Sequence, residues 1–144
     1  MSKVPLEGVW SLVSYTARSA SGEEALPFGE EPMGRLIYTP TGHVSATLCR
    51  TPRPRFASAD RKMGTDGELR VASDGFDAYA GTYEIDAATN RVVHHVALSS
   101  WPNIMGTDQV RYFALDNEDL VLTTPPMLSR GSAWVLTLKW RRLT

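Results

Sequence analysis

The chain has one cysteine, Cys49, among 144 residues, so it cannot form an internal disulfide. It has no apolar run near the roughly 18 residues of a membrane-spanning helix, and its first residues, MSKVPLEGVWSL, lack the apolar core of a secretory signal. Neither sign of charge dominates, because 15 Lys and Arg face 16 Asp and Glu. This balance gives no general attraction to nucleic acid or to anionic membranes. We therefore expect a cytoplasmic protein that binds neither.

The composition is that of an ordinary folded protein, with 42% hydrophobic and 22% charged residues. A chain of this length suits one domain with one core, so we expect a single domain over residues 1–144. No repeat of fixed period is present. The sequence does not decide between a monomer and a homo-oligomer.

Short stretches rich in β-branched and aromatic residues, separated by turn residues, make up most of the chain. In GRLIYTPTGHVSATL, Pro40-Thr41-Gly42 has the residues of a three-residue hairpin loop, which pairs Tyr38 with Val44. Further hairpins are expected to turn at residues 87–90 and 117–119. The pattern predicts an all-β fold, an up-and-down antiparallel β-barrel of about eight strands.

One segment departs from this pattern. After the Pro- and Arg-rich stretch RTPRPR at residues 50–55, Thr65 and Glu68 fit a capping box. We expect one short helix from about Asp66 to Ala78. The loop and the helix are expected to cover the barrel mouth as a lid.

Strand alternation predicts which side chains point into the barrel. It directs His94 inward and His95 outward, and it places Arg111 inward as well. The residues expected inside with them are Val92, Val96, Leu98, Leu115, Leu120, Leu122, Trp134, Leu136, Leu138 and Trp140. Because adjacent strand residues face opposite sides, the two histidines cannot share one ion, and we expect no metal site. No Gly-rich phosphate loop is present, and we expect no cofactor.

Several motifs together carry a family resemblance. LEGVWSLVSY has a Gly-x-Trp pattern at Gly8 and Trp10, and YAGTYEID, VVHHVALSSWPNIMGTDQVRYFALDNEDLVLTTPP and LKWRR follow. With GRLIYTPTGHVSA, these stretches resemble the lipocalin-like domain proteins of bacteria and fungi. The resemblance implies a calycin-type barrel with an internal cavity. It also implies that Trp10 points into the barrel floor, with Arg141 or Arg142 packed across it.

Arg111 is the most informative polar residue, because a guanidinium on an inward face needs an anionic or carbonyl partner. One interpretation is structural, with a salt bridge to Asp108 or Asp77. The other is an anchor for a ligand carboxylate.

His94 has the same two interpretations, as a satisfied core residue or as a ligand contact and general base. We expect Arg111 to lie opposite Val96 or Leu98, on the same wall as His94. The hydroxyls of Tyr38 and Tyr83 and the ring of Trp134 are further candidates for ligand contacts, and packing is the alternative for each.

Three functions follow from these residues. The first is binding of a small, largely hydrophobic molecule with a carboxylate or carbonyl group, anchored by Arg111 and Tyr38. The second is a cofactor-free isomerase, cyclase or lyase, with His94 as base and Arg111 stabilising an oxyanion. The third is a filled barrel that acts as an interaction module. The first two need a cavity of roughly 300 Å³ or more, lined by Arg111 and His94.

Overall fold

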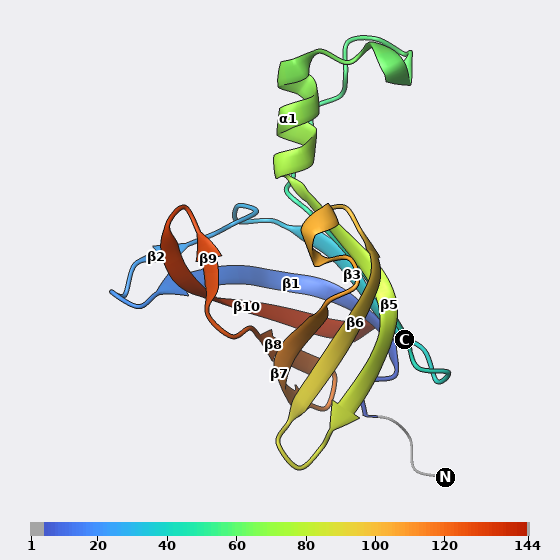
Figure 1. Ribbon diagram of the computed structural model, residues 1–144, viewed down its shortest axis with the longest axis vertical. Coiled ribbons are helices and arrows are strands. Elements are labelled where there is room, and N and C mark those ends of the chain that lie inside the picture. The colour runs from blue at the N-terminus through green and yellow to red at the C-terminus, as the bar shows by residue number, and fades with distance from the viewer. Residues whose placement is uncertain (1–4, 144) are drawn as a thin grey trace.

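The computed structural model describes residues 5–143. In this range all the strands belong to one antiparallel sheet, which curls into a barrel (Figure 1). The strands are β1 (Gly8–Ser19), β2 (Glu24–Ala25), β3 (Met33–Tyr38), β4 (His43–Cys49), β5 (Phe76–Asp86), β6 (Arg91–Ser99), β7 (Asp108–Asp116), β8 (Asp119–Thr123), β9 (Met127–Ser129) and β10 (Ser132–Leu143). The helical elements are α1 (Asp66–Asp74) and two 3₁₀ turns, Arg61–Met63 and Pro102–Ile104.

Eight of these strands close the barrel, in the order β1-β3-β4-β5-β6-β7-β8-β10, and β10 pairs back onto β1. The short strands β2 and β9 only extend the edges. This confirms the predicted barrel of about eight antiparallel strands. The hairpin between β3 and β4 pairs Tyr38 with Val44, as the turn residues predict. Because the barrel is closed, each of these eight strands is hydrogen-bonded to a neighbouring strand on both sides.

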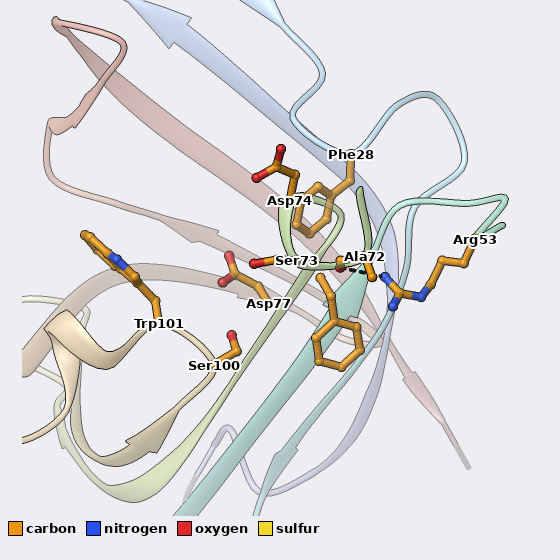
Figure 2. Close-up of a pocket in the computed structure, with 9 residues that line it drawn as sticks. Phe28, Arg53, Ala72, Ser73, Asp74, Asp77, Ser100 and Trp101 are labelled. Carbon is orange, nitrogen blue, oxygen red and sulfur yellow. Dashed lines mark hydrogen bonds between the residues drawn. The ribbon is translucent and has the colours of Figure 1, made fainter. Parts of the chain in front are cut away.

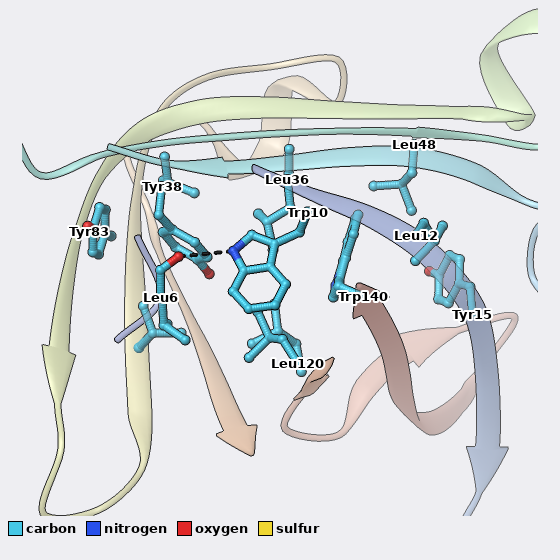
Figure 3. Packing of buried hydrophobic residues seen from close by; sticks show 14 of the residues in the cluster. Leu6, Trp10, Leu12, Tyr15, Leu36, Tyr38, Leu48, Tyr83, Leu120 and Trp140 are labelled. Atoms are coloured by element: carbon cyan, nitrogen blue, oxygen red, sulfur yellow. Dashed lines mark hydrogen bonds between the residues drawn. The ribbon is translucent and has the colours of Figure 1, made fainter. Parts of the chain in front are cut away.

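The floor of the barrel is closed by packed aromatic and aliphatic side chains. Trp10 is fully buried, and its indole nitrogen donates a hydrogen bond of 3.0 Å to the Leu6 carbonyl (Figure 3). The Arg142 guanidinium lies 4.2 Å from the centre of the Trp10 ring and donates to the Glu7 carbonyl at 2.6 Å. The predicted packing across Trp10 is therefore made by Arg142. Its neighbour Arg141 points outward and pairs with Asp119.

A β-bulge in β1 changes which residues of that strand face inward. The register against β10 shifts between Leu12 and Ser14, so alternation restarts there. Trp10 and Leu12 are buried before the bulge, and Tyr15 is buried after it. Strict alternation from Trp10 would have turned Tyr15 outward.

A second bulge, where β5 meets β6, corrects one predicted inward residue. Gly81 pairs with Val96 and Ala80 with Leu98, which leaves Ala97 unpaired. Leu98 is therefore 60% exposed, and its predicted inward position is wrong. A Cβ at Gly81 would lie 1.9 Å from the His95 carbonyl oxygen, so the bulge requires glycine at that position.

Leu115 is also less buried than predicted. It pairs with Leu120 as the turn at Asn117 implies, and Leu120 is fully buried. Leu115 itself is 37% exposed, because it lies next to the turn that connects β7 and β8.

The helix begins as predicted and ends early. Thr65 and Glu68 form the predicted capping box. The helix ends at Asp74, and Gly75 passes the chain into β5 at Phe76, so the predicted end at Ala78 is wrong. No residue of α1 is buried, and the helix projects from the barrel (Figure 1). Among the described residues, no helix has the length and apolar character needed to cross a membrane.

Candidate functional site

A chamber of about 120 Å³ lies inside the barrel. Its polar wall is formed by Asp77 and Tyr79 of β5, His94 of β6, and Gln109 and Arg111 of β7. Its remaining lining is Tyr15, Leu36, Ala46, Leu48, Ala78, Trp101, Ile104, Leu122, Thr124, Met127, Leu136, Leu138 and Trp140. The barrel is therefore hollow and lined by both Arg111 and His94. The volume is smaller than the roughly 300 Å³ expected for a ligand site.

Arg111 is half-buried in the chamber wall, and its neighbours differ from those predicted. It pairs with Val92, and the predicted position opposite Val96 or Leu98 is wrong. β7 begins only at Asp108, opposite His95, because the intervening chain folds back over the end of β6. Residues 92 and 94 face inward alike, so Arg111 and His94 still share one wall.

The Arg111 guanidinium has few partners. Within residues 5–143, Nη1 donates a hydrogen bond to the Val110 carbonyl at 2.9 Å. The guanidinium also lies close enough to the Tyr79 hydroxyl to counter part of the rise that burial causes in the pKa of Tyr79. The described chain forms no ion pair with it. Asp108, one of the predicted partners, binds His95 on the outer face, and Asp77 lines the same chamber without pairing. The described chain therefore gives this cation no direct ion pair, although its charge counters part of the rise that burial causes in the pKa of the Asp77 carboxyl.

His94 is buried between two tyrosine hydroxyls. Its Nε2 lies 2.7 Å from the Tyr38 hydroxyl, and its Nδ1 lies 2.6 Å from the Tyr79 hydroxyl. Burial, followed by the charges of Arg111 and His95, lowers the pKa of His94 to about 3. The ring is therefore neutral near neutral pH, and both of its nitrogens are already engaged. This arrangement suits a fixed hydrogen-bonding group better than a general base.

The other three predicted ligand contacts lie outside the chamber lining. Tyr38 is fully buried behind His94 and reaches the chamber only through that ring. Tyr83 donates its hydroxyl hydrogen to the Thr39 carbonyl at 2.7 Å, away from the chamber. Trp134 is half-buried on β10, where it pairs with Ser19 and Met127.

Tyr79 and Gln109 are chamber residues that the sequence reasoning did not name. Tyr79 lies four residues before Tyr83 on the same strand face, so alternation from Tyr83 would have identified it. Asp77 continues the same face, and the sequence reasoning named it only as a possible partner of Arg111 because it expected the helix to run to Ala78. Gln109 pairs with His94 and lies two residues before Arg111, so alternation from the inward Arg111 would have identified it as well.

A groove of about 570 Å³ adjoins the chamber at the barrel rim (Figure 2). Asp77 and Trp101 line both the groove and the chamber, so they mark the mouth between the two. The end of α1, through Ala72, Ser73 and Asp74, forms another side of the groove. The end of the helix therefore borders the mouth, while its body projects from the barrel and does not cover the mouth as the predicted lid would (Figure 1). Trp101 is 54% exposed.

The charged groups on the outer surface are separate from the chamber. His95 faces outward, as predicted, and lies 2.7 Å from a Glu84 oxygen and 2.6 Å from an Asp108 oxygen. These hydrogen bonds, Asp108 first, raise the pKa of His95. His43 is also outside, on β4. Across residues 5–143, no three His, Cys, Asp or Glu side chains are grouped so that they could hold a metal ion.

Comparison with known proteins agrees with this architecture. The model of a family described as lipocalin-like domain matches residues 7–143. The chain belongs to the lipocalin-like domain family. A fungal relative from Aspergillus oryzae is named as a 4'-hydroxy-3'-methoxypropiophenone carrier protein. It is 34% identical over 107 residues, which cover 69% of this lipocalin-like chain and 96% of the relative. No solved structure matches this lipocalin-like protein.

Proposed function

We propose that this protein binds a small, largely apolar carbonyl compound of the aryl ketone class inside the barrel and carries it. The observation that carries the proposal is Arg111, a half-buried cation without an ion-pair partner in residues 5–143. A charge in such a place is costly unless something compensates it. A ligand oxygen at this position would supply the missing partner.

The wall around Arg111 supports an aromatic ligand. Leu36, Leu122 and Leu138 provide apolar contacts, and Trp140 provides a flat ring. The relative that carries 4'-hydroxy-3'-methoxypropiophenone points to the same class, because that compound combines an aromatic ring with a ketone. Its name suggests a first probe for this chain.

The dimensions support a ligand that is only partly enclosed. A cavity of roughly 150 Å³ holds a benzene molecule, so a chamber of about 120 Å³ fits about one ring after small side-chain adjustments. Substituents would extend past Asp77 and Trp101 into the adjoining groove of about 570 Å³. The outer groove and the inner chamber then form one binding path.

The test is a titration with 4'-hydroxy-3'-methoxypropiophenone, followed by tryptophan fluorescence. Wild-type protein should bind, and Arg111→Met should weaken binding at least tenfold, since a charge-assisted hydrogen bond contributes about 1.5–3 kcal/mol. Arg141→Met is the matched control, because Arg141 pairs with Asp119 on the outer surface. Equal affinities of the wild type and Arg111→Met would refute Arg111 as the anchor.

The two alternatives have less support. An isomerase, cyclase or lyase with His94 as base is disfavoured by the engaged nitrogens and by the lowered pKa of about 3. A filled barrel that acts only as an interaction module is disfavoured by the chamber itself.

A further inference from the structure

The two tyrosines that flank His94 determine where its one ring hydrogen lies. A neutral imidazole has a hydrogen on one nitrogen and a lone pair on the other. Tyr38 contacts Nε2 and Tyr79 contacts Nδ1, so one hydroxyl must donate to the ring and the other must accept from it. Two arrangements satisfy this condition, and they leave the hydrogen of a different tyrosine free.

The surroundings of the two hydroxyls are unequal. Tyr38 is 1% exposed, and within residues 5–143 its hydroxyl has His94 as its sole hydrogen-bond partner. If Nε2 carried the ring hydrogen, the hydroxyl hydrogen of Tyr38 would be left without an acceptor in a dry core, which costs free energy. If Tyr38 donates to Nε2 instead, that cost disappears.

The free hydrogen then belongs to Tyr79. With Nε2 accepting from Tyr38, Nδ1 carries the ring hydrogen and donates it to the Tyr79 oxygen. Tyr79 lines the chamber and is only half-buried, so water or a ligand can accept its hydroxyl hydrogen there. The unpaired guanidinium of Arg111 is on the same chamber wall.

A third donor in the chamber wall also lacks a partner. Trp140 is 2% exposed and lines the chamber. Among the described residues, its indole nitrogen is the one buried side-chain polar atom without a hydrogen bond. Tyr79, Arg111 and Trp140 therefore all line the chamber, and each has at least one side-chain hydrogen for which the described chain supplies no acceptor. Asp77, the acidic member of the lining, stands at the mouth, where the chamber meets the groove.

We propose that the Tyr38–His94–Tyr79 chain presents the Tyr79 hydroxyl as a hydrogen-bond donor to a ligand carbonyl oxygen beside Arg111. This inference rests on the proposed binding of a carbonyl compound and specifies which atom of the ligand is recognised. His94 and Tyr38 are positioning residues, because they act on the ligand only through Tyr79. The chamber then selects for an acceptor oxygen on an otherwise apolar molecule.

The first measurement needs no ligand and no variant. Two-bond ¹H–¹⁵N correlation spectra of the wild-type protein report which imidazole nitrogen carries hydrogen. We expect His94 to be the Nδ1–H tautomer, unchanged between about pH 6 and about pH 8, because its pKa lies well below this range. An Nε2–H tautomer, or a doubly protonated ring, would overturn the proposal.

The second measurement compares propiophenone with propylbenzene, which has the same carbon skeleton without the oxygen. NMR titration of the wild type should give tighter binding of the ketone, and Tyr79→Phe should reduce this preference about tenfold. Tyr83→Phe is the matched control, because its hydroxyl binds the Thr39 carbonyl away from the chamber. This control should keep the full preference.

The outcomes separate the two proposals. Equal binding of ketone and hydrocarbon by the wild type, or an unchanged preference in Tyr79→Phe, would overturn the role of Tyr79 and leave binding in the barrel intact. Failure of the wild type to bind either probe would refute the proposed function, and the role of Tyr79 in recognition with it. Trp140→Phe provides a further check, with a smaller loss of preference expected if its indole N–H also reaches the ligand.

Discussion

Replacing Arg111 with methionine is expected to stabilise the ligand-free protein while it removes ligand binding. The cation makes one backbone hydrogen bond, to the Val110 carbonyl, and no ion pair within the described chain. Losing that bond costs about 1 kcal/mol. Removing a buried charge that has no ion pair returns several kcal/mol for a fully buried ion, less for a half-buried one, and less again here because Arg111 also attracts Asp77. Methionine also fills the space of the arginine stem. We expect a net gain of about 1 kcal/mol.

The assay is urea unfolding of the ligand-free proteins, with Arg142→Met as the opposite case. Arg142 packs 4.2 Å from the Trp10 ring centre and donates to the Glu7 carbonyl, so its loss should cost about 2–4 kcal/mol. The same substitution at two inward-facing arginines should therefore change stability in opposite directions. A loss of more than about 1 kcal/mol in Arg111→Met would refute the reasoning. Arg111 would then be a structural residue.

Two further predictions concern the outer surface and the mouth. His95→Gln should destabilise the protein at about pH 6 and much less at about pH 9. The sign follows because Asp108 and Glu84 raise the pKa of His95, so its stabilisation is complete below the unfolded value of about 6.5 and is lost as the pH rises through the folded value. Urea unfolding at both pH values measures this, and a constant difference would contradict it. Trp101→Ala should release ligand several-fold faster in stopped-flow experiments, because Trp101 lines both sides of the mouth. An unchanged dissociation rate would argue against this entry path.

The features predicted correctly depend on local chemistry. The Pro40-Thr41-Gly42 loop determines the pairing of Tyr38 with Val44, and the side chains of Thr65 and Glu68 determine where α1 begins. Hairpin loops and capping boxes depend on only a few adjacent residues, so they can be predicted from a single sequence. The stacking of Arg142 on Trp10 came from the family resemblance.

The features predicted wrongly depend on bulges and on long connections. Because of the bulge after Val96, the side chain of Leu98 faces outward. Because the loop before Asp108 is long, β7 begins late, and Arg111 pairs with Val92 and not with the predicted Val96 or Leu98. One added residue reverses the alternation, and local propensity carries no signal for it. Arg111 and His94 were still correctly placed on one wall, because the bulge lies beyond both. The partnership of His94 with Tyr38 and Tyr79 spans three strands and could not be read from any single one of them.

The position of the polar groups implies the direction of ligand entry. The floor is sealed by Leu6 and Trp10, which are both fully buried (Figure 3). Arg142 packs over the indole, 4.2 Å from the ring centre. The polar groups line the same chamber as Trp101, and Trp101 also lines the outer groove. The chamber therefore opens toward the groove and not toward the floor. A ligand entering there would meet the carboxylate of Asp77 before the donors deeper in the wall. Since a carboxylate repels anions and accepts hydrogen bonds, this order favours neutral molecules at the mouth and acceptor oxygens inside. A neutral ketone satisfies both requirements, whereas a carboxylic acid, ionised at neutral pH, satisfies only the second.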